Sequence, residues 1–198
     1  PSHINAQQTL KVGVMTGVDE KIMHVAQNVA EKRYGLHIDI IPFSDYVLPN
    51  ESLNDGEIDA NIFQHVPYLN AQIKARGYKL SPIAKTFVYP MGFYSKKIHQ
   101  LSQLPDGAVV AIPNDPSNEG RALRLLQLNG LIRLKSGVGI FGTLRDVVAN
   151  PKHLQLKTLS DAQLPRVLKD ADLVALTDDY VGVAGLTVNQ AIFKEGPN

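Results

Sequence analysis

Apolar residues alternate with polar or small residues at the start of the chain and then change to a helical spacing. Positions 10–14 are apolar at every second residue, which is typical of a strand. Over positions 22–30 the apolar residues recur every three or four positions, which predicts an amphipathic helix that ends by Gly35. Alternation then returns over positions 36–40. Strand, helix and strand within about 30 residues have the length of a right-handed crossover unit, so we expect a parallel sheet.

The same alternation continues through the rest of the chain. We expect strands at 58–63, 108–113, 154–159 and 172–176, extended segments at 80–84 and 87–94, and helices at 67–75, 118–129, 143–149 and 160–169. This order predicts an α/β protein with mostly parallel sheets flanked by helices. Because Pro90-Met91-Gly92 ends a long extended stretch, we expect a first lobe at 1–92 and a second lobe at 93–198.

Composition narrows the classes of function. The 198 residues are 44% hydrophobic, enough for a sizeable core, and 20 basic and 19 acidic side chains leave a net charge of +1. We therefore expect no nucleic-acid partner. The absence of cysteine excludes disulfides and thiolate chemistry. No apolar run reaches the roughly 18 residues of a membrane span, and the polar segment Pro1 to Gln8 does not resemble an export signal.

Two patterns imitate cofactor or metal sites. Gly137-Val-Gly139-Ile-Phe-Gly142 matches a dinucleotide fingerprint, and Asp161 lies about 20 residues beyond it. However, the fingerprint should open a long helix in the first crossover, so we interpret this one as a glycine turn. His37 and Asp39 share one face of a strand, but a metal normally needs three or four ligands. We expect no cofactor, no metal and no catalytic constellation.

The segment Asn61-Ile-Phe-Gln-His-Val-Pro-Tyr68 joins the end of a strand to the start of a helix. Parallel α/β sheets bind ligands at the carboxyl ends of strands, so Phe63, His65 and Tyr68 are candidates for a binding wall. The alternative is that Phe63 and Tyr68 belong to the core and that His65 is a hydrogen-bonded turn residue.

A second strand-to-helix junction is Pro113-Asn-Asp-Pro-Ser-Asn-Glu-Gly-Arg121. Free backbone N–H groups and the positive helix end attract an anion, and Arg121 in the first turn adds a forked donor suited to a carboxylate. The alternative is ordinary capping by Ser117 or Asn118 with Arg121 in solvent.

Several long words of the sequence occur in a fixed order. They are Tyr34-Gly35, Asp45-Tyr-Val-Leu-Pro-Asn50, Gly56-Glu-Ile-Asp-Ala-Asn-Ile-Phe-Gln-His-Val-Pro-Tyr-Leu69, Ala111-Ile-Pro-Asn-Asp-Pro-Ser-Asn-Glu-Gly-Arg-Ala-Leu123 and Ala162-Gln-Leu-Pro-Arg166. From Lys11 to about Glu195 the chain thereby resembles the NlpA lipoprotein family, the methionine-binding components of ABC importers. The resemblance implies a clamp of two α/β lobes, as in periplasmic binding proteins, that closes on its ligand.

The resemblance also implies the ligand contacts. Tyr46, Phe63, His65 and Tyr68 would surround the methionine side chain, and Asn118 and Arg121 would bind the amino-acid head group. Thr177 and Asp178 stand where the family has an asparagine pair, so they are further candidates, and they leave the amino acid and its L or D form open. The resemblance implies that family members continue past Asn198 with a strand that returns to the first lobe. The first lobe of the given sequence is expected to lack this strand, either because the sequence is incomplete or because this protein closes its first lobe differently.

A binding protein for methionine, without enzymatic activity, is the leading hypothesis. The alternatives are a binding protein for another amino acid or a short peptide, a surface antigen that has lost its ligand, and an enzyme on the same fold. The family implies a membrane permease and ATPase complex as partner and a monomeric protein. It also implies a place in the periplasm or on the outer face of the cytoplasmic membrane, with a lipid anchor upstream of the given chain.

Overall fold

The computed structural model describes residues 9–196, so the polar segment Pro1 to Gln8 and the chain end at Asn198 lie outside the described residues. The chain divides into two compact units. One comprises the chain up to Gln64 together with Ile73–Ile83, and the second comprises His65–Gln72 and the chain from Ala84 onward. The lobe boundary expected at Gly92 stays a prediction.

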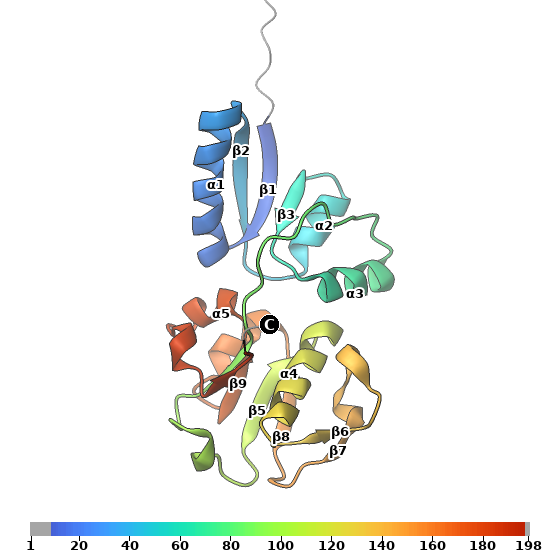
Figure 1. Ribbon diagram of the computed structural model, residues 1–198, viewed down its shortest axis with the longest axis vertical. Helices are drawn as coiled ribbons and strands as arrows, with labels where there is room; N and C mark the ends of the chain where they lie inside the picture. The colour runs from blue at the N-terminus through green and yellow to red at the C-terminus, as the bar shows by residue number, and fades with distance from the viewer. Residues whose placement is uncertain (1–8, 197–198) are drawn as a thin grey trace, which may run out of the picture. The chain divides into compact units, whose positions relative to one another are not determined.

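The first unit is built on the expected strand, helix and strand. The three-stranded parallel sheet has the order β2-β1-β3, with β1 (Thr9–Met15), β2 (His37–Phe43) and β3 (Ala60–Ile62). Helix α1 (Val18–Tyr34) lies along β1 and β2 (Figure 1), and α2 (Leu48–Asn54) precedes β3. Helix α1 ends at Gly35, whose φ of 61° is readily reached only without a side chain. The core of the unit is formed by Val12, Val14, Met23 and Ile38.

The second unit contains a five-stranded sheet with the order β10-β4-β9-β5-β8. The strands are β4 (Gly92–Tyr94), β5 (Val109–Pro113), β8 (Gln155–Leu159), β9 (Leu173–Leu176) and β10 (Phe193–Lys194). Strands β9, β5 and β8 are parallel, and β4 and β10 complete the sheet as antiparallel strands. Helix α4 (Pro116–Leu128) packs on β5, and α5 (Asp178–Val183) follows β9 (Figure 1). The α/β class with parallel strands and flanking helices is therefore confirmed.

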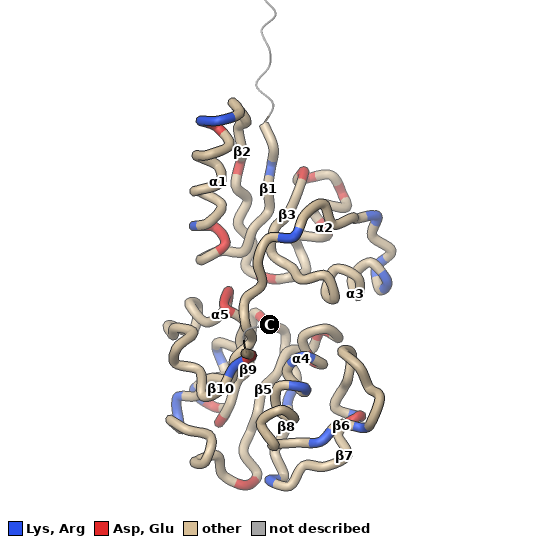
Figure 2. The backbone as a smooth tube through the Cα atoms, in the orientation of Figure 1, with Lys and Arg blue, Asp and Glu red and all other residues tan. Residues whose placement is uncertain are grey.

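The remaining elements are short. A two-stranded antiparallel sheet pairs β6 (Arg133–Leu134) with β7 (Val147–Ala149), and α3 (Val66–Arg76) contains residues of both compact units. The 3₁₀ helices are Leu101–Gln103, Gly139–Phe141, Leu144–Asp146, Asp161–Val167 and Val188–Gln190. None of the helices in the described part of the chain is long and apolar enough to cross a membrane. Figure 2 shows acidic and basic residues interspersed along both units.

Three local expectations differ from the structure. The helix expected at 143–149 is wrong: Thr143 and Asp146 form a capping box around one 3₁₀ turn, after which the β-branched Val147 begins strand β7. The helix expected at 160–169 is a 3₁₀ helix with Pro165 inside it, where the missing N–H disfavours a regular α-helix. Helix α2 was not expected, and of the segments 80–84 and 87–94 only the end forms a strand.

The glycine-rich segment forms turns, as expected. Gly137 and Gly139 have φ values of 78° and 70°, which favour glycine, and the 3₁₀ helix Gly139–Phe141 then packs on α4. At that contact Gly120 of α4 approaches the Ile140 carbonyl so closely that a Cβ atom would overlap its oxygen. The segment is therefore a glycine turn that packs on α4.

We expect Gly120→Ala to lower the free energy of unfolding by about 1–3 kcal/mol, because backbone must move to admit the methyl group. Urea unfolding followed by circular dichroism measures the change. Gly182→Ala in α5 is the matched control, since a Cβ there meets nothing within 4 Å. Equal stability of the two variants would contradict the close-packing argument.

Candidate functional site

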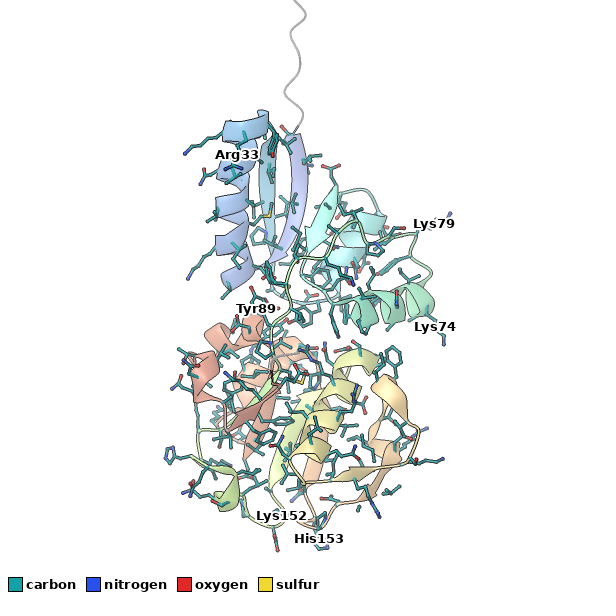
Figure 3. All side chains as sticks on the ribbon, in the orientation of Figure 1. Arg33, Lys74, Lys79, Tyr89, Lys152 and His153 are labelled. Atoms are coloured by element: carbon teal, nitrogen blue, oxygen red, sulfur yellow. The ribbon has the colours of Figure 1, made fainter. Side chains whose placement is uncertain are left out.

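Three parallel strands of the second unit end at the same edge of its sheet. Strand β5 leads through Asp115 into α4, β8 leads to Asp161, and β9 leads to Thr177 and Asp178 at the start of α5. Figure 3 shows Tyr89 at one end of this unit and Lys152 and His153, in the turn before β8, at the other. In parallel α/β sheets the carboxyl edge is where ligands bind.

The first turn of α4 is capped by Asp115. Its Oδ1 accepts hydrogen bonds from Ser117 N at 3.1 Å, Asn118 N at 2.9 Å and Ser117 Oγ at 2.6 Å. Capping by Ser117 or Asn118 is therefore wrong, and the backbone N–H groups expected to be free for an anion are bonded to this carboxylate. Because these N–H groups are bonded, Arg121 is the group near the start of α4 that is suited to a ligand carboxylate.

Arg121 is held by two parallel bonds to one carboxylate. Its Nε donates to Glu195 Oε1 at 2.7 Å and its Nη2 donates to Glu195 Oε2 at 2.6 Å. Nη2 also donates to the Tyr89 carbonyl oxygen at 2.7 Å. The Arg121 side chain is only 17% exposed, so the alternative in which it is solvated is wrong.

Asn118 is buried beside this arginine in the same helix. It is 3% exposed, and its Oδ1 accepts no hydrogen bond within the described residues. Such an acceptor costs free energy unless a donor reaches it. Thr177, also buried, and Asp178 lie at the end of β9, and burial raises the pKa of Asp178.

The pKa of His65 is shifted by burial and by the charged groups around it. Burial, and then the positive charge of Arg121, lower the pKa of His65 to about 4, although Asp115 and Glu195 act in the opposite direction. At neutral pH the imidazole is therefore uncharged. The ring of Tyr68, which is 3% exposed, lies 6.5 Å from the ring of His65 and nearly parallel to it.

The first unit contributes a separate pair of candidates. The rings of Tyr46 and Phe63 lie 5.9 Å apart at 34°. Beside them in the chain, the side chains of Asn50 and Gln64 exchange two hydrogen bonds of 2.7 Å, and Asn61 donates to Asn50 at 3.0 Å. This amide cluster holds the end of β3 against α2.

Sequence reasoning missed two features of the site. Glu195 was not a candidate because nothing in the local pattern marks it, and only the need of a buried arginine for a counter-charge could have indicated it. The amide cluster lies within words of the sequence that carry the family resemblance, but its members were not separated from the rest. In the described part of the chain no group of three or more His, Asp or Glu side chains is arranged to hold a metal ion.

Asp161 is a buried carboxyl group near the capping residue Asp115. Asp161 is 8% exposed, and burial, followed by the charge of Asp115 and a hydrogen bond to it, raises the pKa of Asp161 well above its usual value. A protonated Asp161 can donate to Asp115, which an ionised one cannot.

We expect Asp161→Asn to change how stability depends on pH. Because folding raises this pKa, the stabilisation from Asp161 is fully present below about pH 4 and is lost as pH rises through the folded-state pKa. The amide does not titrate, so the melting temperature of the variant should gain on the wild type as pH rises. Asp170→Asn, at an exposed position nearby, is the control. A pH-independent difference would contradict a protonated Asp161.

We expect the His65 imidazole to titrate near pH 4 in the folded protein, as measured by NMR of its ring carbons. Since the unfolded value is about 6.5, His65 should destabilise the fold as pH falls from about 6.5 to 4. Arg121→Gln removes a nearby positive charge and should raise the pKa, whereas Arg124→Gln, at an exposed position of α4, should not. A folded-state midpoint near 6.5 would refute the assignment.

Comparison with known proteins connects this geometry to characterised relatives. The D-methionine-binding lipoprotein MetQ of Salmonella typhimurium is 52% identical over 198 residues, covering 98% of this chain and 71% of the relative. Lipoprotein 28 of Escherichia coli K12 is 47% identical, over 96% of this chain and 71% of its own.

Solved structures of related binding proteins also match this chain. A nutrient binding protein from Burkholderia cenocepacia bound to methionine matches with a TM-score of 0.91 and 46% identity, over 94% of this chain and 79% of its own. The crystal structure of the methionine binding protein MetQ matches with a TM-score of 0.93 and 51% identity, over 95% and 78%. The family model described as NlpA lipoprotein matches residues 10–198. The chain therefore belongs to the NlpA lipoprotein family.

Proposed function

We propose that this protein is the substrate-binding component of a bacterial ABC importer and that its ligand is methionine. The observation that carries the proposal is the likeness, over 94% of the chain, to a protein whose structure holds methionine. Relatives named as D-methionine-binding lipoproteins support the same ligand. A periplasmic substrate-binding protein of an ABC transporter from Coxiella burnetii, 54% identical with a TM-score of 0.92, supports the transport role.

The chemistry of the candidate residues fits the ligand. A methionine zwitterion needs a donor for its carboxylate, acceptors for its ammonium group and an apolar lining for its thioether. Arg121 offers the charged donor, while Asn118 Oδ1 and Asp178 are acceptors at the same sheet edge. We assign the thioether to the aromatic candidates Tyr46, Phe63, His65 and Tyr68. The uncharged state of His65 suits an apolar lining, because a second positive charge would be costly to bury.

A second candidate competes with methionine as the ligand. Thr177 and Asp178 replace the asparagine pair implied by the family resemblance, so another amino acid or a short peptide is the second candidate. Asp178 adds a carboxylate that can accept a hydrogen bond from a ligand ammonium group. D-Methionine and L-methionine therefore both belong in the first binding assay.

The importer role carries further proposals. The partners are a membrane permease and its ATPase, and the protein acts as a monomer without catalysing a reaction. It works in the periplasm or on the outer face of the cytoplasmic membrane, held by a lipid anchor attached upstream of the given chain. The relatives named as lipoproteins support the anchor.

We expect methionine to raise the melting temperature, because a ligand present at 100 times its Kd stabilises the folded state by about 2.7 kcal/mol. Arg121→Ala should weaken binding in calorimetry by roughly tenfold or more, as loss of a charged hydrogen bond does. Arg124→Ala, at an exposed position of the same helix, is the control and should bind like the wild type.

The experiment can also exclude methionine. If neither enantiomer shifts the melting temperature of the folded wild type at saturating concentration, methionine is not the ligand. A shift produced by a different amino acid would then support the second candidate.

A further inference from the structure

One side of the Arg121 guanidinium is already hydrogen-bonded within the protein. An arginine side chain has five N–H donors, and three of those of Arg121 are used by Glu195 and the Tyr89 carbonyl, through Nε and Nη2. Within the described residues no hydrogen bond is donated by Nη1. If a ligand carboxylate binds Arg121 while Glu195 stays in place, it therefore meets the Nη1 end of the fork.

Glu195 is itself fixed from outside this pair. Its Oε2 accepts the Met91 N–H at 2.8 Å, and its own N–H donates to the Met91 carbonyl oxygen at 2.9 Å. The preceding residues form β10, which pairs with β4, and the rings of Phe93 and Phe193 stack 4.9 Å apart. The sheet therefore holds the carboxylate in place, and the carboxylate orients the arginine.

We propose that Glu195 is a positioning and specificity residue: it orients Arg121 for the carboxylate of a zwitterionic ligand and rejects ligands with net negative charge. This inference rests on the proposed function and deepens it. Glu195 acts through Arg121 and has no contact with the ligand in this scheme.

The charge balance gives the specificity. Glu195 already compensates the charge of Arg121, so a bound carboxylate brings one uncompensated negative charge into a partly buried site. The ammonium group of an amino acid compensates that charge within the ligand itself. A ligand that lacks the ammonium group cannot do so and should be disfavoured.

The opposite interpretation is that Glu195 occupies the place of the ligand carboxylate and must be displaced. Displacement would break two charge-assisted bonds to Arg121 and the bond from Met91 N–H. A free amino acid would have to replace all of these bonds. The geometry therefore favours a positioning role.

The test couples a change in the protein to a change in the ligand. We expect Glu195→Gln to weaken L-methionine binding roughly tenfold or more, because an amide has one acceptor oxygen where the carboxylate serves three N–H donors with two. L-Methioninamide lacks the carboxylate that Arg121 would bind, so its affinity should fall less than that of L-methionine. N-Acetyl-L-methionine, which is anionic, should lose less affinity than L-methionine or gain some.

Glu119→Gln is the matched control. Like Glu195→Gln it replaces a glutamate by its amide, but Glu119 lies in α4 and accepts from the Leu144 N–H rather than from Arg121. It should leave the ratio of L-methionine to L-methioninamide affinity at its wild-type value. Melting curves without ligand establish that each variant is folded.

The outcomes separate the two proposals. If the wild type binds L-methionine and Glu195→Gln weakens both ligands equally, Glu195 is merely structural and the inference is overturned. If the variant binds L-methionine more tightly, Glu195 is a competitor and the inference is again overturned. If the folded wild type binds no form of methionine, the proposed function fails and the inference fails with it.

Discussion

Strands β5, β8 and β9 each end in a segment that begins with polar or acidic residues, and all three segments lie at one sheet edge. Burying that many oxygen atoms together is possible only if each charge is met by a donor, a counter-charge or a proton. All three solutions occur in this unit. Asp115 accepts from N–H groups of α4, Arg121 pairs with Glu195, and burial raises the pKa of Asp161 well above its usual value, which favours the protonated form.

The same requirement explains the state of the aromatic candidates. Burial, and then the positive charge of Arg121, lower the pKa of His65 and keep its imidazole uncharged at neutral pH, although Glu195 acts in the opposite direction. Neutral rings next to charged polar groups suit a ligand that has one apolar end and one zwitterionic end.

Periodicity predicted the elements that bury a face, and it failed where backbone chemistry decides. The bounds of α1 and α4 lie close to those expected. Helix α4 buries an apolar face, whereas Ile22, Val25 and Val29 of the expected α1 stripe are exposed. Residues 147–149 were expected to continue a helix, but two valines and a preceding cap favour a strand. Asp115 was overlooked as the cap because Ser117 and Asn118 are also good capping residues, and spacing alone does not choose among them. Arg121 was found from its place in the first turn, whereas its partner lies 74 residues away and no local pattern could connect the two.

That separation has a consequence for how the protein acquires its site. The bond between Arg121 and Glu195 closes a loop of 74 residues, and the bond from Met91 N–H to Glu195 spans 104. The entropy of closing such long loops opposes these contacts until other parts of the unit hold the segments together. During synthesis α4 can assemble long before Glu195 leaves the ribosome, so the nascent second unit holds an arginine whose direction is not yet defined. The pairing of Arg121 with Glu195 therefore has to wait for the segment that contains strand β10.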